Sequence, residues 1–371
     1  MEYKRFENSS VYMLEVDTRS ELNGPTSTDQ LKAKCNLQNT KISRQFNRLP
    51  FIGKCSFKWF AIWALVVFTF MKSIEPHYKR YILKPFTNPD DTSIFIAPQF
   101  TYGGKTSKKT EMLIVVNSDA DDQKQRDLIR KSWASSKNRK SSTKILFLIG
   151  VPKYTDLETE MAFHQDIINA SIVENYYNLP LKTLVMLQFT DKFFPQIDCL
   201  IKVDSDNFLN VSNLEDLCSS LKGQELITGH CEKTSPVIRN YWSKWYVPEF
   251  VYGQEFYPLY CFGETYMFVG KQVRGKLLSK LGEFGFDTSK NRRQLPEDTI
   301  FSGFLAELAD IRRQNTNGFA LQKYNSKLDC LNGQARAYSF HLINEKSNFA
   351  KAISAMAKAD SIPCTPSDSN N

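Results

Sequence analysis

The sequence predicts an α/β fold in which a mainly parallel sheet is flanked by helices, and three observations lead to this fold class. Beyond residue 110, short apolar runs of strand type alternate with amphipathic segments of helical period. The 371 residues are 42% hydrophobic and 24% charged, which is the composition of a globular protein. One apolar run leads directly into the triplet DSD at residues 204–206. In open sheets of this class, ligands bind beyond the carboxyl ends of the strands, so this strand end is a candidate site.

The individual elements follow from hydrophobic periodicity. Strands are predicted at residues 112–116, 144–150 and 199–203. Helices are predicted at residues 122–134, 155–170, 181–193 and 213–222. We expect Leu128 and Ile129 of the first helix to face the interior, and Ser212 is placed to cap the last one.

Composition divides the chain into five segments. They are a polar cytoplasmic tail, a transmembrane anchor, a stem or linker rich in Pro, Gly, Thr and Lys, the α/β domain and a C-terminal tail, at residues 1–58, 59–71, 72–110, 111–345 and 346–371. The net charge is +8, and half of it lies in residues 1–58, which hold ten Lys and Arg against six Asp and Glu. A nucleic-acid binder concentrates basic residues on its folded part, so we expect no nucleic-acid partner.

The anchor is the uncharged run WFAIWALVVFTFM between Lys58 and Lys72. A full span needs about 20 apolar residues, but the flanking lysines can snorkel and a short span suits a thin membrane. The alternatives are a buried core helix and a signal-peptide segment, and the latter begins much nearer the N-terminus. The five basic residues between positions 41 and 58 favour a cytoplasmic N-terminus, which places everything after Met71 in the lumen.

Six cysteines follow the anchor, and none forms a C-x-x-C pair, which argues against a zinc ribbon. In an oxidising compartment they allow up to three disulfides, with the pairing open, or some stay free. Two N-x-[ST] sequons, at Asn169 and Asn210, are candidate glycosylation sites.

Asp204 and Asp206 are the strongest candidates for a cation site. In extended geometry the two side chains point to the same side, and two such carboxylates repel each other unless a cation lies beside them. Oxygen ligands suit Mg²⁺ or Mn²⁺, which commonly bridge to phosphate. The alternative is a solvated strand end. Lys202, just before the pair, is compatible with either interpretation. The sequence has no dinucleotide-binding glycine motif, P-loop, H-E-x-x-H or G-x-S-x-G motif, so those enzyme classes have little support.

Three further patterns have both a structural and a chemical interpretation. Arg126 and Arg130 are four residues apart on one helical face, where they clamp a diphosphate or form a solvated face. Glu297 and Asp298 follow Pro296 at a predicted helix start, where a carboxylate is either a cap or a positioned general base. The stretch YPLYCFGETYMFVG at residues 257–270 combines aromatics with glycine, as sugar-stacking surfaces and packed aromatic cores both do.

Taken in order, these motifs resemble glycosyltransferase family 31, in its β-1,3-galactosyltransferase branch. The resemblance covers roughly residues 111–345 and rests on the arginine helix, FLIG, YYNLPLKT, KVDSDNF, KWYV, YPLYCFGETYMF, EDTIFSG and a late histidine. It implies a single-pass type II Golgi membrane protein with a catalytic domain of the GT-A type. It also implies a divalent cation, usually Mn²⁺, and inverting transfer of a hexose, galactose first, from a UDP-sugar such as UDP-galactose. The acceptor would be a glycan on a glycoprotein or glycolipid, joined in β-1,3 linkage.

The resemblance also implies roles for individual residues. Asp206 would bind the metal, with His341 as a further ligand, and Asp298 would be the catalytic base. Asp204 would contact the ribose or a second-shell water, and Lys202 is grouped with it as donor-binding. Arg126 and Arg130 resemble the arginines that lie near the uridine diphosphate. The sugars would meet residues of the aromatic and acidic motifs, namely Trp245, Tyr260, Gly263, Glu264 and Glu297.

Departures from the family pattern fall where the donor and acceptor sugars are expected. Leu259 and Phe262 replace Pro and Ser of Y-P-P-Y/F-C-S-G, and Glu264 replaces a small residue. Gly303 comes one place late in E-D-x-x-x-G, and Ser302 occupies the expected position. Two alternatives therefore stay open: transfer of N-acetylglucosamine or N-acetylgalactosamine, and a catalytically inactive sugar-binding relative. A purely structural membrane protein would give no reason for the acids at Asp204, Asp206 and Asp298.

Overall fold

The computed structural model describes residues 63, 65–69, 86, 95–107, 109–320, 328–331, 333–341 and 364. The chain divides into two units, Met1–His77 and Tyr78–Asn371. In the first unit, only Trp63 and residues 65–69 are described, and they are helical and exposed. No helix within the described residues has both the length and the apolar character to cross a membrane. The predicted cytoplasmic tail, most of the predicted anchor and nearly all of the C-terminal tail lie outside the described residues.

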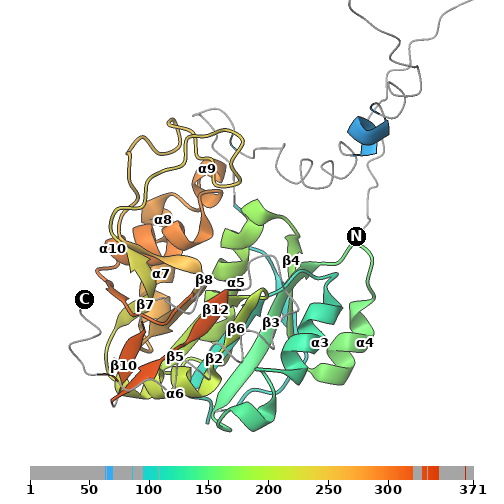
Figure 1. Cartoon of the computed structure of the whole chain (residues 1–371), viewed down its shortest axis with the longest axis vertical. Helices are drawn as coiled ribbons and strands as arrows, with labels where there is room; N and C mark the ends of the chain where they lie inside the picture. Colours follow the sequence, from blue (N-terminus) through green and yellow to red (C-terminus); the bar gives the residue numbers. More distant parts are fainter. Residues whose placement is uncertain are drawn as a thin grey trace, which may run out of the picture. The chain divides into compact units, whose positions relative to one another are not determined.

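The second unit is built on an eight-stranded mixed sheet with the order β1-β4-β3-β2-β5-β8-β7-β9 (Figure 1). Its strands are β1 Phe100–Tyr102, β2 Met112–Asn117, β3 Thr143–Val151, β4 Ile167–Val173, β5 Cys199–Asp204, β7 Leu226–Glu232, β8 Tyr260–Val269 and β9 Arg312–Asn315. The central run β4-β3-β2-β5 is parallel throughout, and β7 and β9 are also parallel. The pairs β1–β4, β5–β8 and β7–β8 are antiparallel. The predicted α/β class with a mainly parallel sheet is therefore confirmed.

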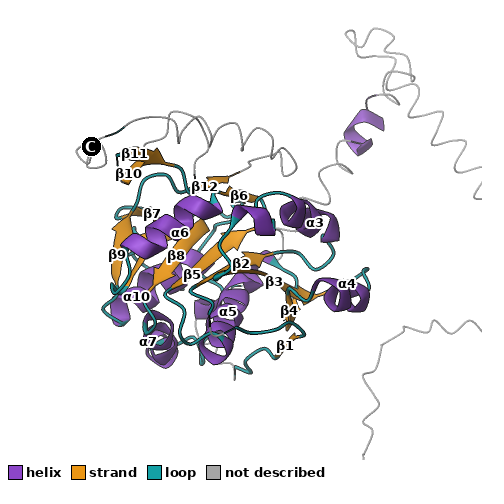
Figure 2. Cartoon of the chain, turned by 90° about the horizontal axis from the view of Figure 1, so that it is seen from below, coloured by secondary structure: helices purple, strands orange, loops and turns teal. Residues whose placement is uncertain are grey.

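Helices cover both faces of this sheet (Figure 2). On one face, α5 Leu179–Phe193, α7 Val273–Ser279, α8 Leu281–Phe284, the π-helical turn η3 Thr299–Phe304 and α10 Leu305–Leu308 share one buried apolar cluster with the strands. On the other, α3 Gln123–Lys131, α4 Leu157–His164 and α6 Val211–Ser220 share a second. Short elements complete the unit: η1 Ser136–Asn138, η2 Tyr176–Asn178 and α9 Lys290–Arg293. Apolar side chains of the central strands β2, β3 and β5 alternate between the two clusters, so these strands are buried on both faces, as is typical of parallel sheets.

Two small sheets lie outside the main one. β10 Asp329–Leu331 pairs with β11 Gln334–Arg336, and β12 Ser339–His341 pairs with β6 Asn207–Leu209. In the second pair His341 lies opposite Asn207. This pairing matters for the site because it brings a residue from the end of the described chain next to the DSD triplet.

The predicted elements match the structure except near residue 165. The three strands are confirmed, and Ile129 is buried with Leu128 packed against the same cluster. The single helix predicted at 155–170 is wrong: α4 ends at His164, Gln165 takes the left-handed conformation with φ 54°, and β4 follows. The isoleucines and valine of β4 favour a strand, and pairing with both β1 and β3 decides the outcome.

Two smaller differences concern the ends of elements. The cap of α6 is Asn210, whose side chain accepts a hydrogen bond from the backbone N–H of Asn213, and not the predicted Ser212. The sheet begins before residue 111, because Phe100–Tyr102 of the predicted linker forms the edge strand β1.

The six cysteines beyond residue 71 form three disulfides, Cys199–Cys218, Cys231–Cys261 and Cys330–Cys364. The first ties β5 to α6, and the second ties β7 to β8. Both therefore brace the strands that lead into the candidate site.

Candidate active site

A cavity of about 490 Å³ opens at the carboxyl end of β5. Ten of the side chains predicted from the sequence line it, namely Lys202, Asp204, Asp206, Trp245, Tyr260, Gly263, Glu264, Glu297, Asp298 and His341. They come from β5, from the start of β8, from the residues just before η3, from β12 and from the loop between β7 and β8. Segments that are far apart in the sequence thus meet at one strand end.

The cavity lies where the strand order reverses. The chain runs from β2 outward to β3 and β4 and then returns to place β5 on the other side of β2. Ligands of open α/β sheets bind at such a switch point. Asn117 ends β2 and Asp204 ends β5, and the two residues are register partners. The topology therefore explains why polar side chains gather here.

Asp206 and His341 form the part of the cavity that fits a divalent cation. His341 Nε2 lies 3.6 Å from Asp206 Oδ2, and its Nδ1 lies 3.7 Å from Glu264 Oε1. Burial alone would lower the pKa of His341, but the neighbouring carboxylates of Asp206 and Glu264 outweigh it and raise that pKa. Within the part of the chain that the structure describes, no three His, Cys, Asp or Glu side chains are grouped to hold a metal by themselves. One carboxylate and one imidazole instead match a cation that completes its coordination with substrate phosphates.

Asp298 lines the same cavity and is held in place by two backbone groups. Its Oδ2 accepts a hydrogen bond from Gly263 N at 2.9 Å, and its Oδ1 accepts one from Thr299 N at 2.9 Å. Burial and the adjacent Glu297 raise the pKa of Asp298 to about 7, although Lys202 opposes the shift. The sequence left two roles open for the carboxylate of Asp298, a helix cap and a general base. The structure shows the capping bond and leaves lone pairs on both oxygens for a substrate hydroxyl.

Lys202 and Glu297 are interior groups that support the site from behind. Lys202 Nζ forms ion pairs with Asp204 Oδ1 at 2.7 Å and Glu297 Oε2 at 3.4 Å, and it donates to the carbonyl of Gly263. Burial alone would lower the pKa of Lys202, but Asp204 and Glu297 raise it. Glu297 Oε1 accepts hydrogen bonds from Thr183 and Tyr266 at 2.6 and 2.5 Å. These contacts fix the ends of β5 and β8 against the start of η3, so both residues position their neighbours. Both also line the cavity, and their predicted ligand contacts stay predictions.

Arg126 and Arg130 lie elsewhere, which corrects their predicted place at the diphosphate. The Arg126 side chain is fully buried and donates to Glu160, Ser118 and the carbonyls of Asp119 and Ala120. These bonds use its five N–H groups.

Arg130 pairs with Asp127, Glu160 and Asp166 and lies over the ring of Phe147. The helical face that carries both arginines is turned toward α4 and the start of β4. The same i, i+4 spacing therefore serves an interior ion-pair network.

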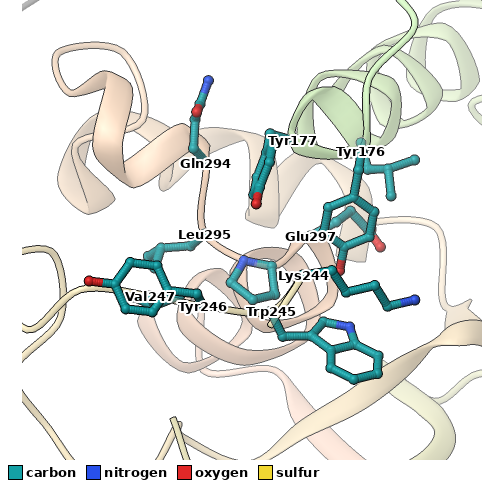
Figure 3. A pocket seen from close by; sticks show the side chains of 11 residues that line it. Tyr176, Tyr177, Lys244, Trp245, Tyr246, Val247, Gln294, Leu295 and Glu297 are labelled. Carbon is teal, nitrogen blue, oxygen red and sulfur yellow. The ribbon is translucent and has the colours of Figure 1, made fainter. Parts of the chain in front are cut away.

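Aromatic side chains form a wall of the cavity. Lys244 Nζ lies 4.5 Å from the ring centre of Trp245 and 5.7 Å from that of Tyr176, and Figure 3 shows the three side chains beside Glu297. The ring centre of Phe262 lies 5.1 Å from that of Tyr260 and 5.0 Å from that of His230. Half of the Trp245 surface is exposed, so its face is available to a ring-shaped ligand.

The departures at Ser302 and Gly303 have a structural explanation. A π-helical turn, Thr299–Phe304, contains both positions, and such a turn holds one more residue than an α-helical turn. The late glycine still meets β8, because a Cβ on Gly303 would lie 3.2 Å from Tyr260 Cβ. Ser302 is fully buried, and its hydroxyl bonds with the backbone of Cys261 and Asp298. The extra residue is thus absorbed without displacing Asp298.

Asn117 is the residue at this edge that sequence reasoning missed. Its amide is buried, and both side-chain polar atoms lack a hydrogen-bond partner among the described residues. Buried polar atoms of this kind generally have a partner, so an orphaned amide at a switch point indicates a ligand or a water. A polar residue directly after the apolar run MLIVV was the available signal.

The two sequons lie in ordered elements. Asn169 is in β4, between Thr101 of β1 and Ile149 of β3. Asn210 caps α6 through its side-chain oxygen. Glycosylation at either position stays a prediction.

Comparison with known proteins gives the chain its family. A family model described as "Galactosyltransferase" matches residues 124–317, which is more than half of the 371 residues. The mouse protein "UDP-GlcNAc:betaGal beta-1,3-N-acetylglucosaminyltransferase 7" is 25% identical over 67% of this chain and 62% of its own length. Human "Beta-1,3-galactosyltransferase 5" is 28% identical over 54% of this chain and 64% of its own length. The chain thus spans just under two thirds of these curated relatives.

Among solved structures, a glycosyltransferase involved in the glycosylation of the major capsid of PBCV-1 aligns with a TM-score of 0.34 and 11% identity. The alignment covers 65% of this chain and 98% of that structure, and its score is too low to establish a shared fold. The family model matches the segment that carries the DSD triplet and the Glu297–Asp298 pair. The chain belongs to the galactosyltransferase family.

Proposed function

We propose that the protein is an inverting hexosyltransferase. It transfers a hexose, galactose first, from a UDP-sugar to a hydroxyl of an acceptor glycan on a glycoprotein or glycolipid, in β-1,3 linkage. The observation that carries the proposal is one cavity whose lining combines Asp206 and His341, which lie 3.6 Å apart, with Asp298. Family membership supports the same reaction.

The chemistry of the cavity lining supports one position for the donor. Asp206 and His341 would hold a divalent cation, Mn²⁺ or Mg²⁺, which neutralises charge on the leaving diphosphate when it is bound. Asp204 lies beside them at the switch point, and the orphaned amide of Asn117 is its register partner. Both can contact the nucleotide portion of the donor. The sugar would then extend toward Glu264 and Asp298, along the aromatic wall.

The transfer step depends on Asp298. An acceptor hydroxyl attacks the anomeric carbon, the bond from that carbon to the diphosphate oxygen breaks, and UDP leaves. Asp298 accepts the proton of the hydroxyl, and Gly263 N and Thr299 N keep its carboxylate in place. General-base assistance of this kind contributes about 10²–10⁴-fold to a rate. Single displacement on one face inverts the anomeric centre.

The cellular setting belongs to the proposal as well. We place the protein in the Golgi membrane as a single-pass type II protein with a lumenal catalytic domain of the GT-A type. Three disulfides among the six cysteines beyond residue 71 suit an oxidising lumen. The uncharged run at residues 59–71 supplies the anchor.

A second donor class has a specific observation in its favour. The mouse relative that aligns over 261 residues carries a name that specifies transfer of N-acetylglucosamine. The full-length protein, supplied with Mn²⁺ and in turn with UDP-galactose, UDP-N-acetylglucosamine and UDP-N-acetylgalactosamine, would be tested on a glycan array. Transfer from UDP-galactose supports the proposal. Transfer only from an N-acetylhexosamine donor would show that the donor sugar is not galactose. A protein that neither transfers sugar nor hydrolyses any donor would be an inactive relative.

A further inference from the structure

We infer that Glu264 orients His341 for divalent-cation binding through a contact with the ring nitrogen that does not face Asp206. The inference rests on the proposed function, because the cation is the one that is bound with the UDP-sugar. It assigns Glu264 a positioning role at a place where the family pattern has a small residue.

The imidazole of His341 lies between two carboxylates, with one at each nitrogen. Nε2 is 3.6 Å from Asp206 Oδ2, and Nδ1 is 3.7 Å from Glu264 Oε1. Nδ1 is buried and has no hydrogen-bond partner among the described residues. Glu264 is the carboxylate beside that atom, and a shift of about half an ångström closes the gap to a normal hydrogen bond.

The two contacts are almost equal in length, so a cation bound beside Asp206 would decide which nitrogen carries the proton. A neutral imidazole has one N–H and one lone pair, and a metal takes the lone pair. With the proton on Nδ1, directed at Glu264, the lone pair of Nε2 faces Asp206 and the cavity. Histidine ligands of metals almost always donate their second N–H to a carboxylate, carbonyl or water, which fixes the tautomer and the ring orientation.

The backbone brings these three residues together but does not orient the ring. β12 places His341 opposite Asn207, the residue after Asp206. β8 pairs Thr265 with Val203 of β5, so Glu264 lies at the same strand end. The rotation of the imidazole about the side-chain bonds of His341 is therefore determined by contacts with other side chains. Glu264 provides such a contact on the side away from Asp206.

The charge of the cavity is consistent with this role. Its acidic lining residues are Asp204, Asp206, Glu232, Glu264, Glu297 and Asp298, against Lys202 and Lys244. Another carboxylate in such a site is favourable when it accepts a hydrogen bond from an imidazole that itself binds a cation. Contact with a hydroxyl of the donor sugar is the competing role for Glu264.

The test measures Mn²⁺ binding rather than turnover. The signal of free Mn²⁺ in electron paramagnetic resonance gives its dissociation constant for the full-length protein in the presence of UDP. We expect Glu264→Gly to weaken Mn²⁺ binding about 10–100-fold, the usual effect of losing such a partner. Glu264→Gln, which keeps an acceptor oxygen for Nδ1–H, is expected to lose less. In a His341→Ala background, Glu264→Gly is expected to have almost no further effect, because the two residues act as one unit.

Several outcomes would overturn the inference. One is an unchanged Mn²⁺ constant in both Glu264 variants, with a raised KM for the UDP-sugar, which would assign Glu264 to the sugar. Another is a double variant, Glu264→Gly with His341→Ala, whose loss of Mn²⁺ affinity equals the sum of the two single losses. A third is a wild-type protein that does not bind Mn²⁺, which leaves glycosyl transfer itself open to a metal-independent route. The opposite combination, Mn²⁺ binding that depends on Glu264 without transfer from any UDP-sugar, would support this inference and contradict the proposed function.

Discussion

The backbone N–H of Gly263 donates a hydrogen bond to Asp298 Oδ2 at 2.9 Å, and a side chain on Gly263 would meet the same carboxylate. The bond joins the start of β8 to the start of η3. It sets the position of the proposed base by close backbone approach. The requirement for glycine at this place is therefore spatial.

Gly263→Ala is the first prediction. An added Cβ would lie 3.2 Å from Asp298 Oδ2 and 3.4 Å from its Cβ, so the carboxylate has to move. We expect kcat to fall by about tenfold or more, because misplacement of a catalytic group by about 1 Å can cost about 10² in rate. UDP affinity is expected to be unchanged. Gly275→Ala is the matched control, since that glycine is in α7 with open space around it. Equal kcat values for Gly263→Ala and the wild type would contradict the positioning role.

The pH profile is the second prediction. Burial and Glu297 raise the pKa of Asp298 to about 7, and only the deprotonated carboxylate accepts a proton. We therefore expect log kcat to rise by about one per pH unit below 7 and to level off above it. Initial rates at saturating donor between pH 5 and 9 measure this. A profile that is flat through pH 7 would show that another group limits the reaction.

The third prediction concerns Arg126. Replacing Arg126 leaves the buried Glu160 paired with Arg130 alone. Removing one partner of a buried ion pair costs up to about 3–5 kcal/mol in the free energy of unfolding. We expect Arg126→Met to lower the denaturation midpoint, with UDP affinity retained under conditions where the variant is folded. Lys124→Met, at an exposed position of the same helix, is the control. If Arg126→Met kept wild-type stability but lost UDP binding, Arg126 would be assigned to the diphosphate of the donor after all.

Asp206→Ala is the fourth prediction. It removes the carboxylate that lies 3.6 Å from His341 Nε2, and with it the oxygen donor proposed for the cation. Calorimetric titration with UDP is expected to show an affinity that no longer increases when Mn²⁺ is added. A Mn²⁺ dependence equal to that of the wild type would exclude Asp206 as a ligand.

The sequence was sufficient for the fold class and for ten of the residues that line the cavity, because those depend on local patterns and on motifs that resemble the family. The DSD triplet follows an apolar run, and Pro296–Asp298 begins a helical segment, so both could be recognised without tertiary information. The helix predicted at 155–170 was wrong because β4 owes its conformation to strands on both sides. Arg126 and Arg130 could not be placed, because a basic helical face looks the same whether it meets a phosphate or Glu160.

Asn117 and the π-helical turn show what tertiary contacts added. No local signal separates an orphaned amide from a solvated one at the end of a strand. The one-residue delay of Gly303 was visible in the sequence, but its accommodation in a π turn depends on the contact with Tyr260. The charge network behind the site is equally non-local, since Lys202, Thr183 and Tyr266 converge on Glu297 from three different elements.

The most direct test of the account compares Asp298→Asn with the wild type in two measurements on the same preparation. Asparagine keeps the size of the side chain but cannot accept the proton of an acceptor hydroxyl. We predict that kcat for transfer from UDP-galactose falls by about 10²–10⁴-fold, while the calorimetric affinity for UDP with Mn²⁺ stays within about twofold. Transfer by Asp298→Asn at the wild-type rate would contradict the assignment of Asp298 as the base.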